Sequence, residues 1–291
     1  MNHRDTENTE KEKPFFATVA NKKRQYLIHH FLETSAELYP DKVALIHKDV
    51  QATYAEINAR ANRMASWLSE RGVHQGDRVA LILKNGLEYV ITYFAVLKAG
   101  AVEVSLSTDI KPDGLTPLLK SLQPKVLVSS FHFEKLLKET DIKETSVRDL
   151  VLISPKTIRQ GDTFSVTAFE ELVTGGPTNN PNNSIDESSL AGIVYTSGST
   201  GKPRGVMLSH KNVVSNTHAI CRYLHLTPDD IQMVVLPFFY VMGKSLLNTH
   251  FAVAGTVVIN NQFAFLASVL NDMVTYKVTG FSGVPSTYAY L

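Results

Sequence analysis

Disulfide bonds and thiolate metal clusters are excluded by the near-absence of cysteine from this 291-residue chain. Cys221 is the only cysteine, so no internal disulfide can form. This usage fits a reducing compartment, and we expect a cytoplasmic protein. The ten histidines show no metal-ligand spacing, and we interpret His210 as a neighbour of a helix N-terminus rather than as a catalytic base.

Long hydrophobic runs and an excess of one charge are missing as well. The most apolar run, residues 89–104, is interrupted by Lys98, Gly100 and Glu103 and is shorter than the roughly 20 apolar residues that cross a bilayer. The formal net charge is +1, which gives no overall field to attract nucleic acid or an anionic membrane. We therefore expect no membrane span and no nucleic-acid partner.

Residues 1–25 are polar, of mixed charge and without a hydrophobic core segment. They match neither a signal peptide nor a membrane anchor, and we expect a mobile tail. The whole chain is 44% hydrophobic and 20% charged, which is the composition of an ordinary globular protein with a well-formed core.

From residue 26 onward, short strands rich in Val, Leu and Ile alternate with amphipathic helices. In the helix expected at 53–72, Thr53 and Glu56 have the spacing of a capping box. Near-continuous apolar strands predict a doubly wound α/β fold, with mostly parallel sheets covered by helices on both faces.

The segment 174–189 is rich in Gly, Pro, Asn and Ser and has no apolar period, which predicts a surface loop or linker. It would divide a first α/β subdomain, 26–173, from a second one, 190–291, and we expect the two to be stacked. The alternation stops at 284–291, where a further helix opens, so the second subdomain is expected to be incomplete at its C-terminus.

The stretch YTSGSTGKPRGVMLSH, residues 195–210, follows a hydrophobic strand and is expected to lead into a helix. Glycines allow close backbone approach, hydroxyl groups donate hydrogen bonds, and lysine adds a charge, which together suit a polyphosphate. It is not the common P-loop, because Pro203 stands where that motif requires Ser or Thr. A flexible surface loop without a ligand is the alternative. The candidate phosphate-binding residues are Thr196, Ser197, Gly198, Ser199, Thr200, Gly201, Lys202 and Arg204.

This stretch resembles the phosphate-loop signature of the AMP-forming adenylating enzymes, which include acyl-CoA synthetases and nonribosomal peptide adenylation domains. The resemblance extends from about residue 27 to the end of the chain. It implies an enzyme that joins a carboxylate to the α-phosphate of ATP, releases pyrophosphate, and passes the acyl group to a thiol. ATP, magnesium, and coenzyme A or a carrier-protein pantetheine are the implied cofactors, with an acyl carrier protein as a candidate partner and Thr196 as a candidate magnesium ligand. Arg204 stands where the family usually has Lys, which keeps the charge but changes its geometry.

Two later segments resemble family motifs that border the acyl substrate. In LPFFYVMG, residues 236–243, Tyr240 occupies the position of a family histidine, and Gly243 ends the motif. Tyrosine can donate a hydrogen bond but cannot act as an imidazolium. In VTGFSGVPSTY, Gly283 is the candidate pocket residue. Core packing of the aromatic residues and a turn requirement at Gly283 are the alternative explanations.

The segment 231–270 contains neither Asp nor Glu. Relatives that activate amino acids place an Asp there to pair the substrate ammonium, and a buried ammonium without a counter-ion is costly. We therefore expect an apolar carboxylate, most simply a fatty acid.

The family's adenine, magnesium and ribose motifs, and the mobile domain with its lysine, have no counterpart in the 291 residues. The sequence is thus expected to be the N-terminal part of an AMP-forming acid–thiol ligase, inactive by itself. The alternative is a noncatalytic nucleotide- or acyl-binding module, or a fragment completed by another polypeptide.

Overall fold

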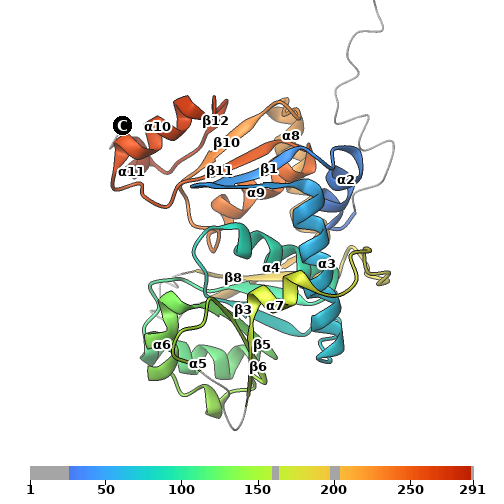
Figure 1. The fold of residues 1–291 in the computed structure, drawn as a ribbon, viewed down its shortest axis with the longest axis vertical. Helices are drawn as coiled ribbons and strands as arrows, with labels where there is room; N and C mark the ends of the chain where they lie inside the picture. Colours follow the sequence, from blue (N-terminus) through green and yellow to red (C-terminus); the bar gives the residue numbers. More distant parts are fainter. Residues whose placement is uncertain (1–25, 159–163, 197–203, 290–291) are drawn as a thin grey trace, which may run out of the picture.

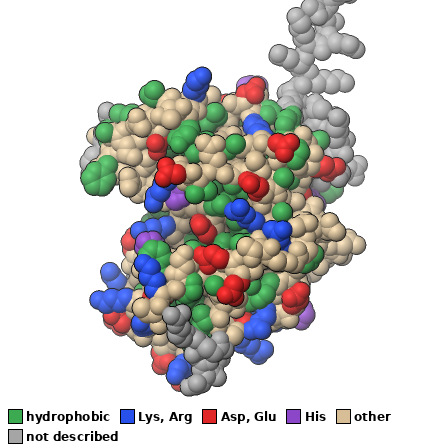
Figure 2. Space-filling model, in the orientation of Figure 1, with side chains coloured by type: hydrophobic (Ala, Val, Ile, Leu, Met, Phe, Trp, Pro, Cys, Tyr) green, Lys and Arg blue, Asp and Glu red, His purple; other side chains and the backbone are tan. Residues whose placement is uncertain are grey.

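The computed structural model describes residues 26–158, 164–196 and 204–289, and the tail expected at 1–25 lies outside these ranges. The described chain forms two β-sheets with helices between and outside them (Figure 1). No helix in the described ranges is long and apolar enough to cross a bilayer. Acidic and basic side chains are interspersed over the face shown in Figure 2.

The larger sheet has seven strands in the order β7-β6-β5-β3-β4-β8-β9. All neighbouring pairs are parallel except β8 and β9. The buried residues of β4 and β5 confirm the near-continuous apolar pattern of a doubly covered sheet. The strands are β3 (Arg78–Leu81), β4 (Val102–Ser105), β5 (Val126–Ser130), β6 (Asp149–Ile153), β7 (Ser165–Ala168), β8 (Leu190–Thr196) and β9 (Arg204–Ser209).

The smaller sheet has five strands in the order β12-β10-β11-β1-β2, parallel except for the β1–β2 pair. Both sheets contain strands from either side of the 174–189 segment, so their boundaries differ from the chain-order division that the sequence predicts. Sequence patterns identify strands but not their distant partners. The strands are β1 (Val43–His47), β2 (Val50–Thr53), β10 (Ile231–Val234), β11 (Thr256–Ile259) and β12 (Gly280–Phe281).

A central layer of helices fills the space between the two sheets (Figure 1). One continuous core joins its side chains to the inner faces of both sheets, where Leu45 and Val79 both contribute. The central layer comprises α2 (His30–Leu38), α3 (Tyr54–Glu70), α4 (Leu87–Lys98), α7 (Phe169–Thr174), α8 (His210–Tyr223) and α9 (Val241–Ala252).

Separate helices cover the outer face of each sheet, as expected for a doubly wound fold. Leu115 and Leu119 of α5 (Pro112–Leu122) and Leu137 of α6 (Glu134–Glu139) pack on the seven-stranded sheet. Val269 of α10 (Leu266–Thr275) packs on the five-stranded sheet. The short helices η1 (Phe131–Phe133), η2 (Ile142–Glu144) and α11 (Pro285–Tyr288) complete the described chain.

Local signals in the sequence account for several helix starts. Thr53 and Glu56 form the predicted capping box of α3. Ser209 and Asn212 form a second one, which makes His210 the first residue of α8, as expected. The sequence did not predict β9 between the phosphate loop and α8. Its first four residues are exposed, so this strand lacks the apolar alternation of a buried one.

Candidate functional site

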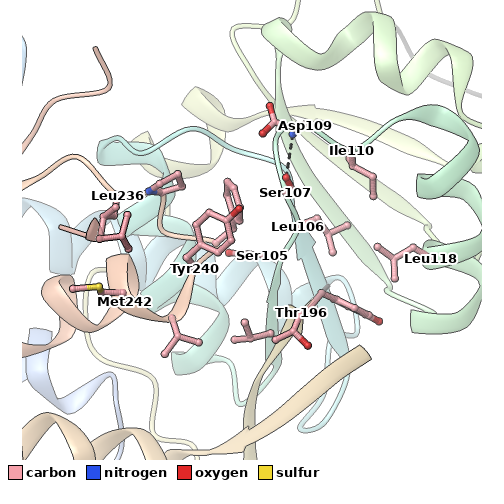
Figure 3. Close-up of a pocket in the computed structure, with 16 residues that line it drawn as sticks. Ser105, Leu106, Ser107, Asp109, Ile110, Leu118, Thr196, Leu236, Tyr240 and Met242 are labelled. Carbon is pink, nitrogen blue, oxygen red and sulfur yellow. Dashed lines mark hydrogen bonds between the residues drawn. The ribbon is translucent and has the colours of Figure 1, made fainter. Parts of the chain in front are cut away.

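A pocket of about 870 Å³ lies where β4, β8 and β10 end (Figure 3). The segments that follow parallel strands meet at the same edge of a sheet, which is the usual place for a ligand site in an open α/β fold. The pocket is lined by Ser105, Leu106, Ser107, Asp109, Ile110, Leu118, Val194, Tyr195, Thr196, Leu236, Pro237, Phe239, Tyr240, Val241, Met242 and Val284.

Most of these lining side chains are apolar, and the polar ones lie at the strand ends. Ser105 and Ser107 follow β4, and the Asp109 N–H donates to Ser107 Oγ at 3.2 Å. Thr196 lies at the end of β8. An apolar cavity with a few placed polar groups suits a small molecule that is largely hydrophobic and carries a polar end.

The described ends of the phosphate loop meet at this pocket. Thr196 lines it, and Thr196 pairs with Arg204 in the antiparallel β8–β9 register. Thr196 Oγ1 donates to the Arg204 carbonyl oxygen at 3.5 Å. The six candidate residues between these strands, Ser197, Gly198, Ser199, Thr200, Gly201 and Lys202, lie outside the described residues. The loop therefore connects two strands, rather than a strand and a helix as the sequence suggests.

The aromatic run before α9 divides between core and pocket. Phe238 is fully buried and Phe239 is 9% exposed, whereas Tyr240 is 55% exposed and lines the pocket. The rings of Phe239 and Tyr240 lie 4.4 Å apart. Core packing thus accounts for Phe238, while Tyr240 faces the cavity (Figure 3).

Asn85 fixes the backbone that leads to Tyr240. Its Nδ2 donates to the Leu236 carbonyl oxygen at 2.8 Å, and its Oδ1 accepts from the Phe238 N–H at 2.8 Å. Asn261 Nδ2 donates to the Asn85 carbonyl oxygen at 2.8 Å. Sequence reasoning missed Asn85, because a single asparagine between a strand and a helix is an ordinary turn residue.

The two candidate glycines lie against neighbouring chain atoms. A Cβ at Gly243 would lie 2.8 Å from the Leu236 carbonyl oxygen, so α9 approaches the preceding segment too closely for a side chain. A Cβ at Gly283 would lie 2.6 Å from the Thr287 Cβ. These contacts support the turn and packing explanation of both glycines, and Val284, next to Gly283, lines the pocket instead.

A buried polar network forms the wall behind Tyr240. Lys244 Nζ of α9 lies 2.5 Å from Glu103 Oε2 of β4, and both side chains are at least nine-tenths buried. Ser105 Oγ donates to Glu103 and lies 2.6 Å from the Tyr89 hydroxyl. Burial, followed by the nearby Glu103 carboxylate, raises the pKa of Tyr89 well above its usual value. Tyr89 therefore remains a neutral hydrogen-bonding group.

A smaller pocket of about 320 Å³ adjoins the same wall between β8, α8 and α9. Lys244 and Asn248 line it together with Asn212, Asn216 and Thr217. The Lys244 ammonium is already held by Glu103, so this pocket offers mainly neutral amide and hydroxyl groups.

A family model described as AMP-binding enzyme matches residues 32–291. The chain belongs to the AMP-binding enzyme family. It is 31% identical over 204 residues to a dimodular nonribosomal peptide synthase from Bacillus subtilis, covering 68% of this chain and 8% of that protein.

Two solved structures of the AMP-binding enzyme fold illustrate the match. The o-succinylbenzoate CoA synthetase of Bacillus subtilis is 27% identical, with a TM-score of 0.75 over 90% of this chain and 50% of its own. A fatty acyl CoA synthetase of Mycobacterium tuberculosis has a TM-score of 0.78 over 92% of this chain and 51% of its own, and at 23% identity it shows the fold alone. The chain spans between 3% and 51% of the length of the curated relatives that it matches.

Proposed function

We propose that this chain provides the ATP- and acyl-binding part of an AMP-forming acid–thiol ligase. The observation that carries the proposal is the position of Thr196 and Arg204, which places both ends of the phosphate loop at an apolar pocket. In this reaction a carboxylate oxygen attacks the α-phosphorus of ATP, the bond to pyrophosphate breaks, and the acyl-adenylate forms. A thiol then displaces AMP to give the thioester.

The nucleotide phosphates would be held by the phosphate loop. Lys202 and the glycine and hydroxyl groups beside it have the chemistry to bind the β- and γ-phosphates, and Thr196 offers a hydroxyl that suits magnesium. Arg204 begins β9 and presents a planar fork rather than a point charge, so it would bind phosphate oxygens in pairs.

The acyl substrate of the proposed reaction is an apolar carboxylate, most simply a fatty acid. Support comes from the apolar side chains of Leu106, Ile110 and Met242 in the pocket. Glu103 is the acidic group that β4 brings close to α9, and Lys244 neutralises it. It therefore offers little to the ammonium of an amino acid. Tyr240, exposed at the pocket, would border the acyl group as an aromatic wall and hydrogen-bond donor.

The thiol acceptor is coenzyme A or the pantetheine of an acyl carrier protein. The CoA synthetase among the similar structures favours coenzyme A, and the nonribosomal peptide synthase favours a carrier protein. A soluble, cytoplasmic reaction fits both acceptors.

Binding of acyl-adenylate mimics by the 291-residue chain tests the proposal. Calorimetry would compare a fatty acyl sulfamoyl-adenosine with an aminoacyl one. We expect tighter binding of the fatty analogue, and loss of about 1.5–3 kcal/mol of binding free energy in Lys202→Ala, which removes a charge-assisted contact. Lys135→Ala, on the exposed face of α6, is the matched control. Preference for the aminoacyl analogue, or equal affinity of Lys202→Ala and wild type, would contradict the proposal.

A further inference from the structure

The first turn of α2 brings together two histidines and a glutamate far from the phosphate loop in sequence. His29, His30 and Glu33 each offer one ligand atom, and these atoms all lie within 4.8 Å of one another. Glu33 is three residues after His30 and four after His29, a spacing that places side chains on one helix face. The Glu33 N–H donates to the His29 carbonyl oxygen at 3.1 Å, which shows that the turn is formed.

His29 has a polar atom that lacks a protein partner. Its Nδ1 is buried and has no hydrogen bond within the described residues, and the residue is 6% exposed. An unsatisfied buried polar atom is uncommon in a folded protein and calls for a bound water or ion. Burial, followed by the neighbouring His30, lowers the pKa of His29 well below its usual value. The imidazole is therefore neutral at physiological pH, as a metal ligand must be.

Contacts from two other helices hold this turn in place. His210 Nδ1 of α8 accepts from the Ile28 N–H at 3.2 Å, which fixes the backbone just before His29. The His29 and His210 rings meet edge to face with centroids 5.9 Å apart. Partners outside the ligand set that fix ligand orientation are typical of metal sites.

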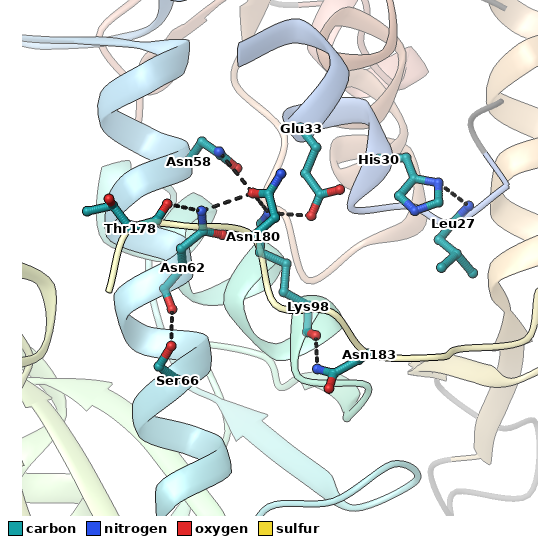
Figure 4. A network of polar contacts seen from close by, with 10 residues as sticks. All are labelled: Leu27, His30, Glu33, Asn58, Asn62, Ser66, Lys98, Thr178, Asn180 and Asn183. Carbon is teal, nitrogen blue, oxygen red and sulfur yellow. Dashed lines mark hydrogen bonds and ion pairs between the residues drawn. The ribbon is translucent and has the colours of Figure 1, made fainter. Parts of the chain in front are cut away.

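Lys98 is the charged neighbour that a bound cation would meet. Its Nζ lies 2.6 Å from Glu33 Oε1 and donates to Asn180 Oδ1 at 3.1 Å (Figure 4). The ion pair uses one carboxylate oxygen, and a carboxylate has a second oxygen that can bind a metal. Because Lys98 and a cation would share Glu33, this lysine should weaken cation binding without preventing it.

We propose that His29, His30 and Glu33 form a binding site for a divalent transition metal ion of the zinc type. Two imidazoles and one carboxylate are a common zinc ligand set, and three protein ligands leave a fourth position for water or another group. Nitrogen ligands favour zinc, cobalt and nickel over magnesium and calcium. The site lies on α2 in the central helix layer and is independent of the proposed ligase reaction.

The sequence analysis found no metal-ligand spacing among the histidines, and it did not predict α2. The pattern His-His-x-x-Glu becomes a cluster only in a helix, where one turn brings the first and fifth residues together. His210 joins the surroundings from a position 180 residues further along the chain.

Cobalt titration of the chelator-treated, full 291-residue chain tests this site. Visible absorption of Co²⁺ reports nitrogen and oxygen ligation, and Zn²⁺ added afterwards reports competition. We expect one Co²⁺ per chain, displaced by one Zn²⁺. His30→Ala and Glu33→Gln should each weaken Co²⁺ binding by at least about tenfold, because each removes a ligand. His74→Ala, an exposed histidine outside the cluster, is the matched control.

Lys98→Met provides a readout that a nonspecific histidine site would not give. It removes the competing cation from Glu33, so Co²⁺ binding should become tighter than in wild type. Circular dichroism would first establish that each variant is folded. Absence of saturable binding, or equal Co²⁺ affinity in wild type, His30→Ala and Glu33→Gln, would overturn the proposal. Binding that depends on His74 instead would overturn it as well.

Discussion

Replacing Lys244 with methionine removes one partner of a buried ion pair and leaves the other in place. The Lys244 and Glu103 side chains are 10% and 2% exposed and lie 2.5 Å apart. Removing one member of such a pair costs about 3–5 kcal/mol, because the remaining charge stays buried without compensation. For a chain of this size we expect Lys244→Met to lower the melting temperature by about 6–10 °C.

Adding Glu103→Gln to Lys244→Met should recover much of this loss. The double variant buries no charge, and Ser105 keeps its contact with the Tyr89 hydroxyl. We expect a net cost of no more than about 2 kcal/mol relative to wild type. Urea unfolding, followed by the fluorescence of Trp67, the only tryptophan, measures the four proteins of the cycle. Equal destabilisation of the single and double variants would refute the reasoning, since it would show that packing rather than charge sets the cost.

Three further perturbations test the same region and its surroundings. Asn85→Ala leaves two buried backbone groups without partners and should cost about 2–4 kcal/mol by urea unfolding; a loss under about 0.5 kcal/mol would contradict the assigned contacts. Gly243→Ala should destabilise the start of α9, because its Cβ would lie 2.8 Å from a backbone oxygen of the preceding segment; a melting temperature equal to that of wild type would count against this packing. Burial lowers the pKa of His250 to about 4. The unfolded state therefore binds the proton first, and about 3 kcal/mol of stability should disappear as the pH falls from about 6.5 to 4. Unfolding measured across this range in wild type and His250→Gln checks it, and identical pH slopes would contradict the assignment.

Local signals allowed most strands and helices to be predicted from the sequence. The Thr53–Glu56 capping box and the apolar strands have short-range causes, because caps and alternation depend on residues only a few positions apart. Strand partners were not predictable in the same way. The pairing of β1 with β11 joins Leu45 to Val257, and no local pattern encodes that distance.

The 174–189 segment shows how a polar sequence can hide a specific structure. Its composition predicts a surface loop, yet Asn180 Oδ1 accepts hydrogen bonds from Asn58, Asn62 and Lys98 (Figure 4). Asn183 Nδ2 donates to the Lys98 carbonyl oxygen at 2.7 Å. Asparagine is typical of loops because it bonds readily to backbone and side chains, and the same property lets it anchor a segment to two helices.

For the candidate site, the sequence identifies the motifs but not the residues that hold them in position. Tyr240 belongs to a segment whose backbone is fixed by Asn85, and the helix that follows is tied to β4 through Lys244 and Glu103. The absence of acidic residues from 231–270 correctly describes that segment, but the carboxylate beside α9 comes from β4. Substrate selection therefore depends on the charge state of a residue pair that spans two elements. If Glu103 lost its lysine partner, its carboxylate would become available to an ammonium group, so Lys244→Met should shift ligand preference toward amino acids while it lowers stability.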